Sequence, residues 1–68
     1  MNNKNFRKTL KQLRVGKGFL QTDVAAALGV NRKTVSAWES GKSMPTVDKI
    51  DAICDLYKVS YDDIRWKV

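Results

Sequence analysis

Residues 32–37, with the sequence RKTVSA, combine two cationic side chains with small polar and apolar ones. A helix built in this way can face a DNA groove. Arginine and lysine can bond guanine O6 and N7, serine can bond a base edge, and an alanine methyl group can contact the thymine methyl. The candidate base-reading residues are Arg32, Lys33, Ser36 and Ala37. The two cations could instead bind phosphates only, because such side chains serve either role.

The residues around this stretch predict two short helices that cross at a tight turn. Ala25 is small where the second helix must approach the first, and Gly29 can adopt the positive φ that ends a helix and turns the chain at once. Asn31 can cap the free backbone N–H groups of the second helix. The pattern predicts helices over residues 21–28 and 32–40, while Leu20 cannot cap the first of them.

Apolar periodicity and capping signals predict three further helices, so the fold class is all-α with five helices. The first is expected over residues 5–15, with Phe6, Leu10 and Leu13 on one stripe. A loop over residues 41–45 leads to a helix capped by Thr46 that reaches about residue 57. A short fifth helix is expected from the Ser60 and Asp63 capping box. We expect one domain over residues 1–68, since this length suffices for one small core.

Residues 21–40 resemble the helix-turn-helix of the Cro and phage-repressor type, the Xre family of DNA-binding regulators. Leu10, Leu13 and Arg14 are similar to the family's first helix, and residues 39–45 resemble its E-x-G-x-x-x-P loop. The resemblance covers about residues 5–64. It implies a compact, lambda-repressor-like domain in which the second and third helices form the motif and the third enters the major groove.

The resemblance also implies roles for residues around the reading helix. Gln21 is similar to the family's phosphate-binding glutamine, and the N-terminus of its helix suits an anion. The expected phosphate-binding residues are Gln21, Lys17, Asn31, Ser40, Lys42 and Ser43. Arg14 and Glu39 match the family's ion pair between the first helix and the end of the third. Such a pair would fix the angle of the reading helix.

The charge of the chain is unevenly distributed. The net charge is +6, and residues 1–42 hold nine Lys or Arg against two acidic residues, whereas residues 43–68 hold four against five. A basic face gains affinity for a polyanion because it releases counterions from phosphates. A solvated lysine surface would give the same composition, so charge alone does not decide for nucleic acid.

The composition argues against metal sites, cofactors and catalysis. The chain has no histidine and a single cysteine, Cys54, which leaves zinc and most transition metals without ligands. There is no glycine-rich phosphate loop and no histidine to activate a serine or cysteine. We therefore expect no enzyme and no cofactor. Since no apolar run could span a bilayer, we expect a cytoplasmic protein with no membrane contact.

A domain of this size reads few base pairs, so a homodimer on a two-fold operator is expected. The tail over residues 64–68 places Ile64, Trp66 and Val68 on one face at the period of a strand, which is a candidate dimer interface. Trp66 could instead fold back on its own core. These residues cannot decide between the two.

The leading functional hypothesis is a bacterial or phage transcriptional regulator, a repressor that binds double-stranded operator DNA. It could be controlled by a separate antirepressor protein. The alternative is an antitoxin or anti-regulator whose main partner is a protein, such as a toxin. A role in RNA binding ranks third, because no aromatic stacking platform is visible in the sequence.

Overall fold

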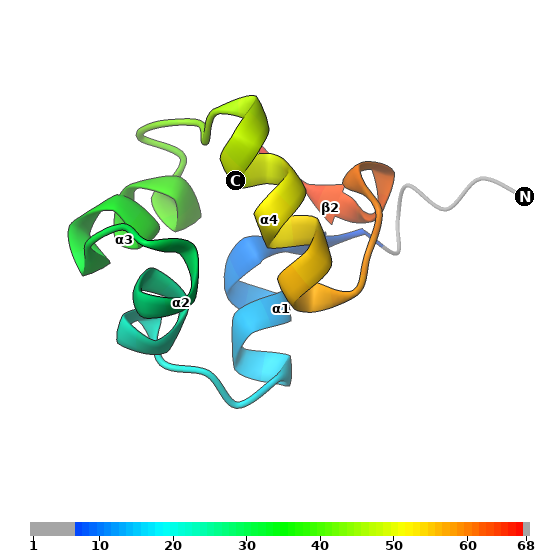
Figure 1. Cartoon of the computed structure of the whole chain (residues 1–68). Coiled ribbons are helices and arrows are strands. Elements are labelled where there is room, and N and C mark those ends of the chain that lie inside the picture. The colour runs from blue at the N-terminus through cyan, green and yellow to red at the C-terminus, as the bar shows by residue number, and fades with distance from the viewer. Residues whose placement is uncertain (1–6, 68) are drawn as a thin grey trace, which may run out of the picture.

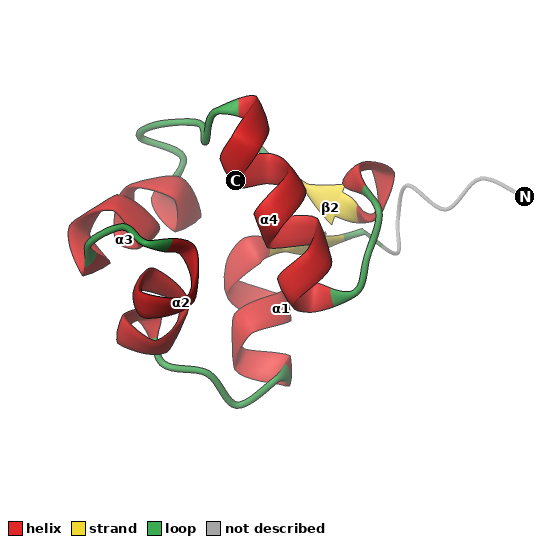
Figure 2. Cartoon of the chain, viewed as in Figure 1, coloured by secondary structure: helices red, strands yellow, loops and turns green. Residues whose placement is uncertain are grey.

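The computed structural model describes residues 7–67, and helices make up most of them (Figures 1 and 2). The elements, in chain order, are strand β1 (Lys8–Thr9), helices α1 (Leu10–Gly16), α2 (Gln21–Leu28), α3 (Arg32–Ser40) and α4 (Val47–Tyr57), the 3₁₀ helix η2 (Tyr61–Asp63) and strand β2 (Ile64–Arg65). Figure 1 shows α3 on the side of the molecule away from β2. The prediction of a mostly helical fold is confirmed, but its five helices are not.

Helix α1 begins at Leu10, later than the sequence predicted. Gln12 N donates to Thr9 Oγ1 at 3.1 Å, and Thr9 N donates to Gln12 Oε1 at 2.8 Å. This reciprocal capping box satisfies free backbone groups and fixes the start of the helix. The expected start at residue 5 is therefore wrong, because residues 8 and 9 form a strand; Phe6 lies outside the described residues.

The expected bounds of α2 and α3 are confirmed, and local backbone chemistry explains them. Although Leu20 cannot cap α2 with its side chain, Asp23 Oδ2 accepts a bond of 2.7 Å from Leu20 N. Gly29 has a φ of 69° and ends α2 in the left-handed conformation. Asn31 Oδ1 then accepts a bond of 2.9 Å from Thr34 N and caps α3. Three residues, 29–31, thus separate the two helices.

The predicted fifth helix is replaced by a single 3₁₀ turn and a strand. Asp63 Oδ2 accepts bonds of 3.0 Å from both the backbone N–H and the hydroxyl of Ser60, which closes the turn. Ile64 then adopts extended dihedral angles and begins β2, which pairs in parallel with β1 in the register Lys8 with Ile64 and Thr9 with Arg65. The expected C-terminal strand is present, and its partner is the N-terminal strand of the same chain.

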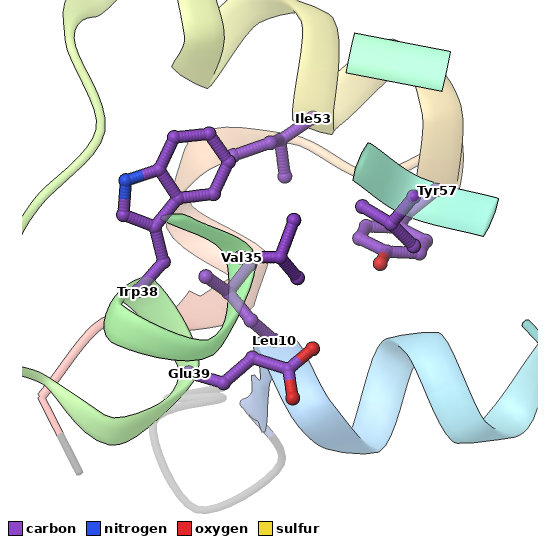
Figure 3. Close-up of a pocket in the computed structure, with 7 residues that line it drawn as sticks. Leu10, Val35, Trp38, Glu39, Ile53 and Tyr57 are labelled. Carbon is purple, nitrogen blue, oxygen red and sulfur yellow. The ribbon is translucent and has the colours of Figure 1, made fainter. Parts of the chain in front are cut away.

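The core lies between α1, the helix-turn-helix pair and α4. Its buried members are Leu10, Val24, Ala25, Leu28, Val35, Trp38, Ile53, Tyr57 and Ile64. Figure 3 shows side chains from α1, α3 and α4 around a cavity of about 10 Å³. A volume of this size corresponds to about one water-sized sphere, so the core that supports α3 is closely packed.

Candidate nucleic-acid interface

Helix α3 has one face in the core and one face in solvent. Val35 and Trp38 are 2% and 7% exposed, which anchors the helix from within. Arg32 and Lys33 at its first turn are exposed, and Ser36 and Ala37 one turn later are partly exposed. A solvent-open hollow of about 270 Å³ is lined by Arg32, Lys33, Ser36, Ala37, Ser40 and Lys42. All four base-reading candidates and two phosphate candidates therefore share one surface.

The other phosphate candidates do not line this hollow. Gln21 begins α2 and is partly buried, whereas Lys17 lies in the exposed turn after α1 and Ser43 in the loop after α3. Asn31 is exposed, but its Oδ1 atom is already bonded to the backbone N–H and the hydroxyl of Thr34. Only the amide nitrogen of Asn31 remains for a further partner.

Arg14 and Glu39 form a partly buried ion pair between α1 and the last turn of α3. Arg14 Nε lies 2.7 Å from Glu39 Oε2, and the two side chains are 11% and 6% exposed. Arg14 Nη1 also donates to the Phe19 carbonyl at 2.9 Å. The hydrogen bond to Glu39 raises the pKa of Arg14 above its ordinary value, so the guanidinium is held charged.

A chain of side-chain hydrogen bonds connects this ion pair to the start of α3. Gln21 Nε2 donates to Glu39 Oε1 at 3.1 Å, and Arg32 Nη1 donates to Gln21 Oε1 at 3.2 Å. The sequence did not predict these bonds. The only local signal is that Gln21 and Arg32 each begin a helix of the motif, and the crossing angle of the helices decides whether they meet.

The three dimer candidates have different surroundings. Ile64 is 1% exposed and belongs to the core of its own chain. Trp66 is partly buried, stacks on Tyr61 with ring centroids 5.3 Å apart, and donates from Nε1 to the Tyr61 carbonyl at 3.3 Å. Val68 lies outside the described residues. Within residues 7–67, only Trp66 of the three presents an accessible side chain.

Among the described residues, no group of three or more acidic, histidine or cysteine side chains is placed to hold a metal ion. The helices in the same part of the chain are too short or too polar to cross a membrane. Burial raises the pKa of the Cys54 thiol, and nearby aspartates add to this effect, so the thiolate form is disfavoured.

Comparison with known proteins gives one family match and several relatives. A family model described as helix-turn-helix matches residues 10–64. The chain is 37% identical over 59 residues to the HTH-type transcriptional activator BcrR of Enterococcus faecalis, covering 87% of this chain and 29% of that protein. It is 37% identical over 57 residues to the antitoxin PezA of Streptococcus pneumoniae, covering 84% of this chain and 36% of PezA.

A third relative is matched over most of its length. The chain is 32% identical over 57 residues to YgzD, an uncharacterized HTH-type transcriptional regulator of Bacillus subtilis, covering 84% of this chain and 86% of that protein. BcrR and PezA are much longer, and the chain spans only about a third of each. No solved structure matches the chain significantly. The chain belongs to the Xre- and Cro-like helix-turn-helix family of DNA-binding regulators.

Proposed function

We propose that the chain binds a specific double-stranded DNA operator and represses transcription by occluding a promoter. The observation that carries the proposal is the two-sided character of α3, whose apolar face is anchored in the core while Arg32 and Lys33 are exposed at its first turn. In this motif the N-terminal residues of the second helix meet base edges in the major groove. The helix is thus anchored in the core while its cationic end faces solvent.

Base reading and backbone binding are assigned to different residues. Arg32 or Lys33 pairs with guanine, Ser36 bonds a base edge, and the Ala37 methyl group contacts a thymine methyl. The phosphates are bound by Gln21, Lys17, Asn31, Ser40, Lys42 and Ser43, of which Ser40 and Lys42 line the hollow. The excess of basic residues in positions 1–42 supports this assignment, because backbone contacts supply much of the affinity for DNA.

Repression requires more specificity than one small domain supplies, so we infer a homodimer on a two-fold operator. Half-sites would be separated by about 34 Å, one turn of DNA. Because Ile64 is part of the core, the interface is built around Trp66 and the residues beside it. BcrR is named as a transcriptional activator, so activation is the alternative direction of regulation. A reporter gene under the selected operator decides between the two directions.

Selection of bound duplexes from a random pool, at two or more salt concentrations, tests the proposal. We expect a two-fold consensus whose affinity falls steeply with salt. The matched variant replaces Arg32, Lys33 and Ser36 with alanine and keeps the core residues of α3. Failure to recover any consensus would exclude specific reading, and an unchanged consensus with the triple variant would exclude these residues as readers.

A second candidate function follows from the likeness to PezA, which is an antitoxin. In that case the main partner would be a protein, and DNA binding would accompany it. The test is co-expression of the chain with the product of the neighbouring gene. A stable complex that relieves growth arrest would support the antitoxin function, whereas a product that neither arrests growth nor binds the chain would exclude it.

A further inference from the structure

Lys49 makes a tertiary contact that connects α4 to the helix-turn-helix unit. Its Nζ atom donates a hydrogen bond of 2.8 Å to the backbone carbonyl of Leu28, at a partly buried site. Leu28 is the last residue of α2, and the final carbonyls of a helix lack partners within the helix. A cation at this end also interacts favourably with the helix dipole. The ammonium group thus gives the last carbonyl of α2 a hydrogen-bond partner.

The bond lies where a small displacement would change the direction of α3. Gly29 follows Leu28 directly and reverses the chain, and α3 begins three residues after Gly29. Figure 1 shows this turn on the side of the motif that faces α4, in agreement with the bond from Lys49. Leu28 is itself buried, so the bond from Lys49 holds a carbonyl that lies next to the core.

The motif is therefore fixed to the rest of the domain by cations at two places. Arg14 of α1 binds Glu39 in the last turn of α3, while Lys49 of α4 binds the end of α2, just before α3 begins. One contact near each end of α3 restricts its rotation more than either contact alone. We propose that Lys49 is a positioning residue that sets the orientation of α3 on DNA and is not itself a phosphate ligand.

This inference rests on the proposed DNA binding, and it predicts that Lys42 and Lys49 contribute differently to the salt dependence of that binding. Lys42 is exposed and lines the hollow beside α3, so a phosphate could replace water at its ammonium group. Lys49 already bonds a carbonyl. Each lysine that neutralises a phosphate makes the slope of log affinity against log salt more negative by roughly 0.9. Lys42 should contribute to this slope, and Lys49 should not.

The test compares Lys49→Met, Lys49→Arg and Lys42→Met in the full chain, with the duplex selected by the wild-type protein as probe. Affinities are measured at several salt concentrations and at a temperature where circular dichroism shows every variant folded. For Lys49→Met we expect about a tenfold loss of affinity at every salt concentration and an unchanged slope, since a bond to a charged group is lost. Lys49→Arg should retain most of the affinity. For Lys42→Met, the salt dependence should become shallower, with a slope smaller in magnitude by about one.

Two results would overturn the positioning role. If folded Lys49→Met binds DNA with wild-type affinity, the bond only stabilises the fold. If its affinity depends less steeply on salt than that of the wild type, Lys49 contacts phosphate. Both leave the proposed function intact, whereas a wild-type chain that binds no duplex would remove the proposed function and this inference together. If Lys49→Met folds poorly, amide chemical shifts of Lys49→Gln, which is shorter and uncharged, give a second readout, with Lys49→Arg as the control that should show few changes. Changes concentrated at residues 28–32 support the inference, and their absence contradicts it.

Discussion

Gln21 Oε1 accepts a hydrogen bond of 3.2 Å from Arg32 Nη1, so the first residues of α2 and α3 are joined through their side chains. The amide nitrogen of Gln21 donates to Glu39 Oε1 at 3.1 Å. An ionised carboxylate can only accept, so Glu39 determines which end of the amide faces Arg32. The amide oxygen is therefore directed at the guanidinium and limits its rotation before any DNA is bound.

Replacing Gln21 with methionine should weaken discrimination at the base pair that Arg32 contacts. The side chain keeps its length but loses its acceptor. We expect a loss of about 1 kcal/mol, below the usual range for a bond to a charged group, because the contact is exposed. The measurement compares affinities for duplexes that differ only at that base pair, with Arg32→Met as the reference. An equal loss for every duplex with an unchanged salt slope would mean that Gln21 acts only as a neutral phosphate ligand, because an amide releases no counterion.

Replacing Glu39 with alanine should destabilise the fold strongly. Arg14 would keep its charge at a site where it is only 11% exposed, and loss of one partner of a buried pair costs about 3 to 5 kcal/mol. This is a large part of the total stability of a small domain. Urea unfolding followed by circular dichroism measures the loss.

The double variant with methionine at positions 14 and 39 is the control for this prediction. It removes both charges and fills similar volumes, so it should regain part of the stability. A Glu39→Ala protein within about 1 kcal/mol of the wild type would mean that water compensates the charge of Arg14.

Tyr57 should make stability depend on pH in the alkaline range. Burial, with a contribution from the nearby Glu39 carboxylate, raises the pKa of Tyr57 to about 12. Because the unfolded chain loses this proton near pH 10, the neutral phenol contributes stability that is complete below about pH 10 and is lost as the pH rises towards 12. The shift corresponds to roughly 2 to 3 kcal/mol.

Urea unfolding between pH 9 and pH 12 measures this effect, with Tyr57→Phe as the matched variant. The variant should lose less stability over that range and should lack the tyrosinate absorbance that develops near pH 12. Equal alkaline losses in both proteins would show that other groups cause the dependence.

The helices of the motif could be predicted from the sequence because their signals are local. Gly29 and Asn31 end one helix and cap the next within three residues, and the structure places both boundaries where these residues predict them. The start of α1 also has a local signal, the Thr9 and Gln12 capping box. The stripe of Phe6, Leu10 and Leu13 predicted an earlier start, so the expected helix extended too far towards the N-terminus.

Contacts between distant segments could not be predicted in the same way. Strand β1 forms because Lys8 pairs with Ile64, and two-residue strands leave almost no pattern of their own. The exposed residues of α3 follow from helical spacing, so the solvent face of this helix was predictable. The bonds from Arg32 to Gln21 and from Lys49 to Leu28 depend on how helices cross, which no local spacing encodes.

The proposed dimer should depend on Trp66 more than the folded monomer does. Ile64 is 1% exposed and β2 pairs with β1, so removal of the tail after Asp63 would take away core packing as well as any interface. Trp66→Ala is the more selective change because the ring is partly exposed and packs on Tyr61. We expect a weaker association constant in sedimentation equilibrium and a melting temperature close to that of the wild type.

Ile64→Ala is the matched control for Trp66→Ala, and it should have the opposite profile. Truncation of a fully buried isoleucine costs about 2 to 5 kcal/mol, so this variant should lose monomer stability first. If Trp66→Ala lowers the melting temperature and leaves association unchanged, the ring serves its own core. Since that result would leave Val68 and the exposed residues beside it as the candidate interface, the same measurement on Val68→Ala would follow.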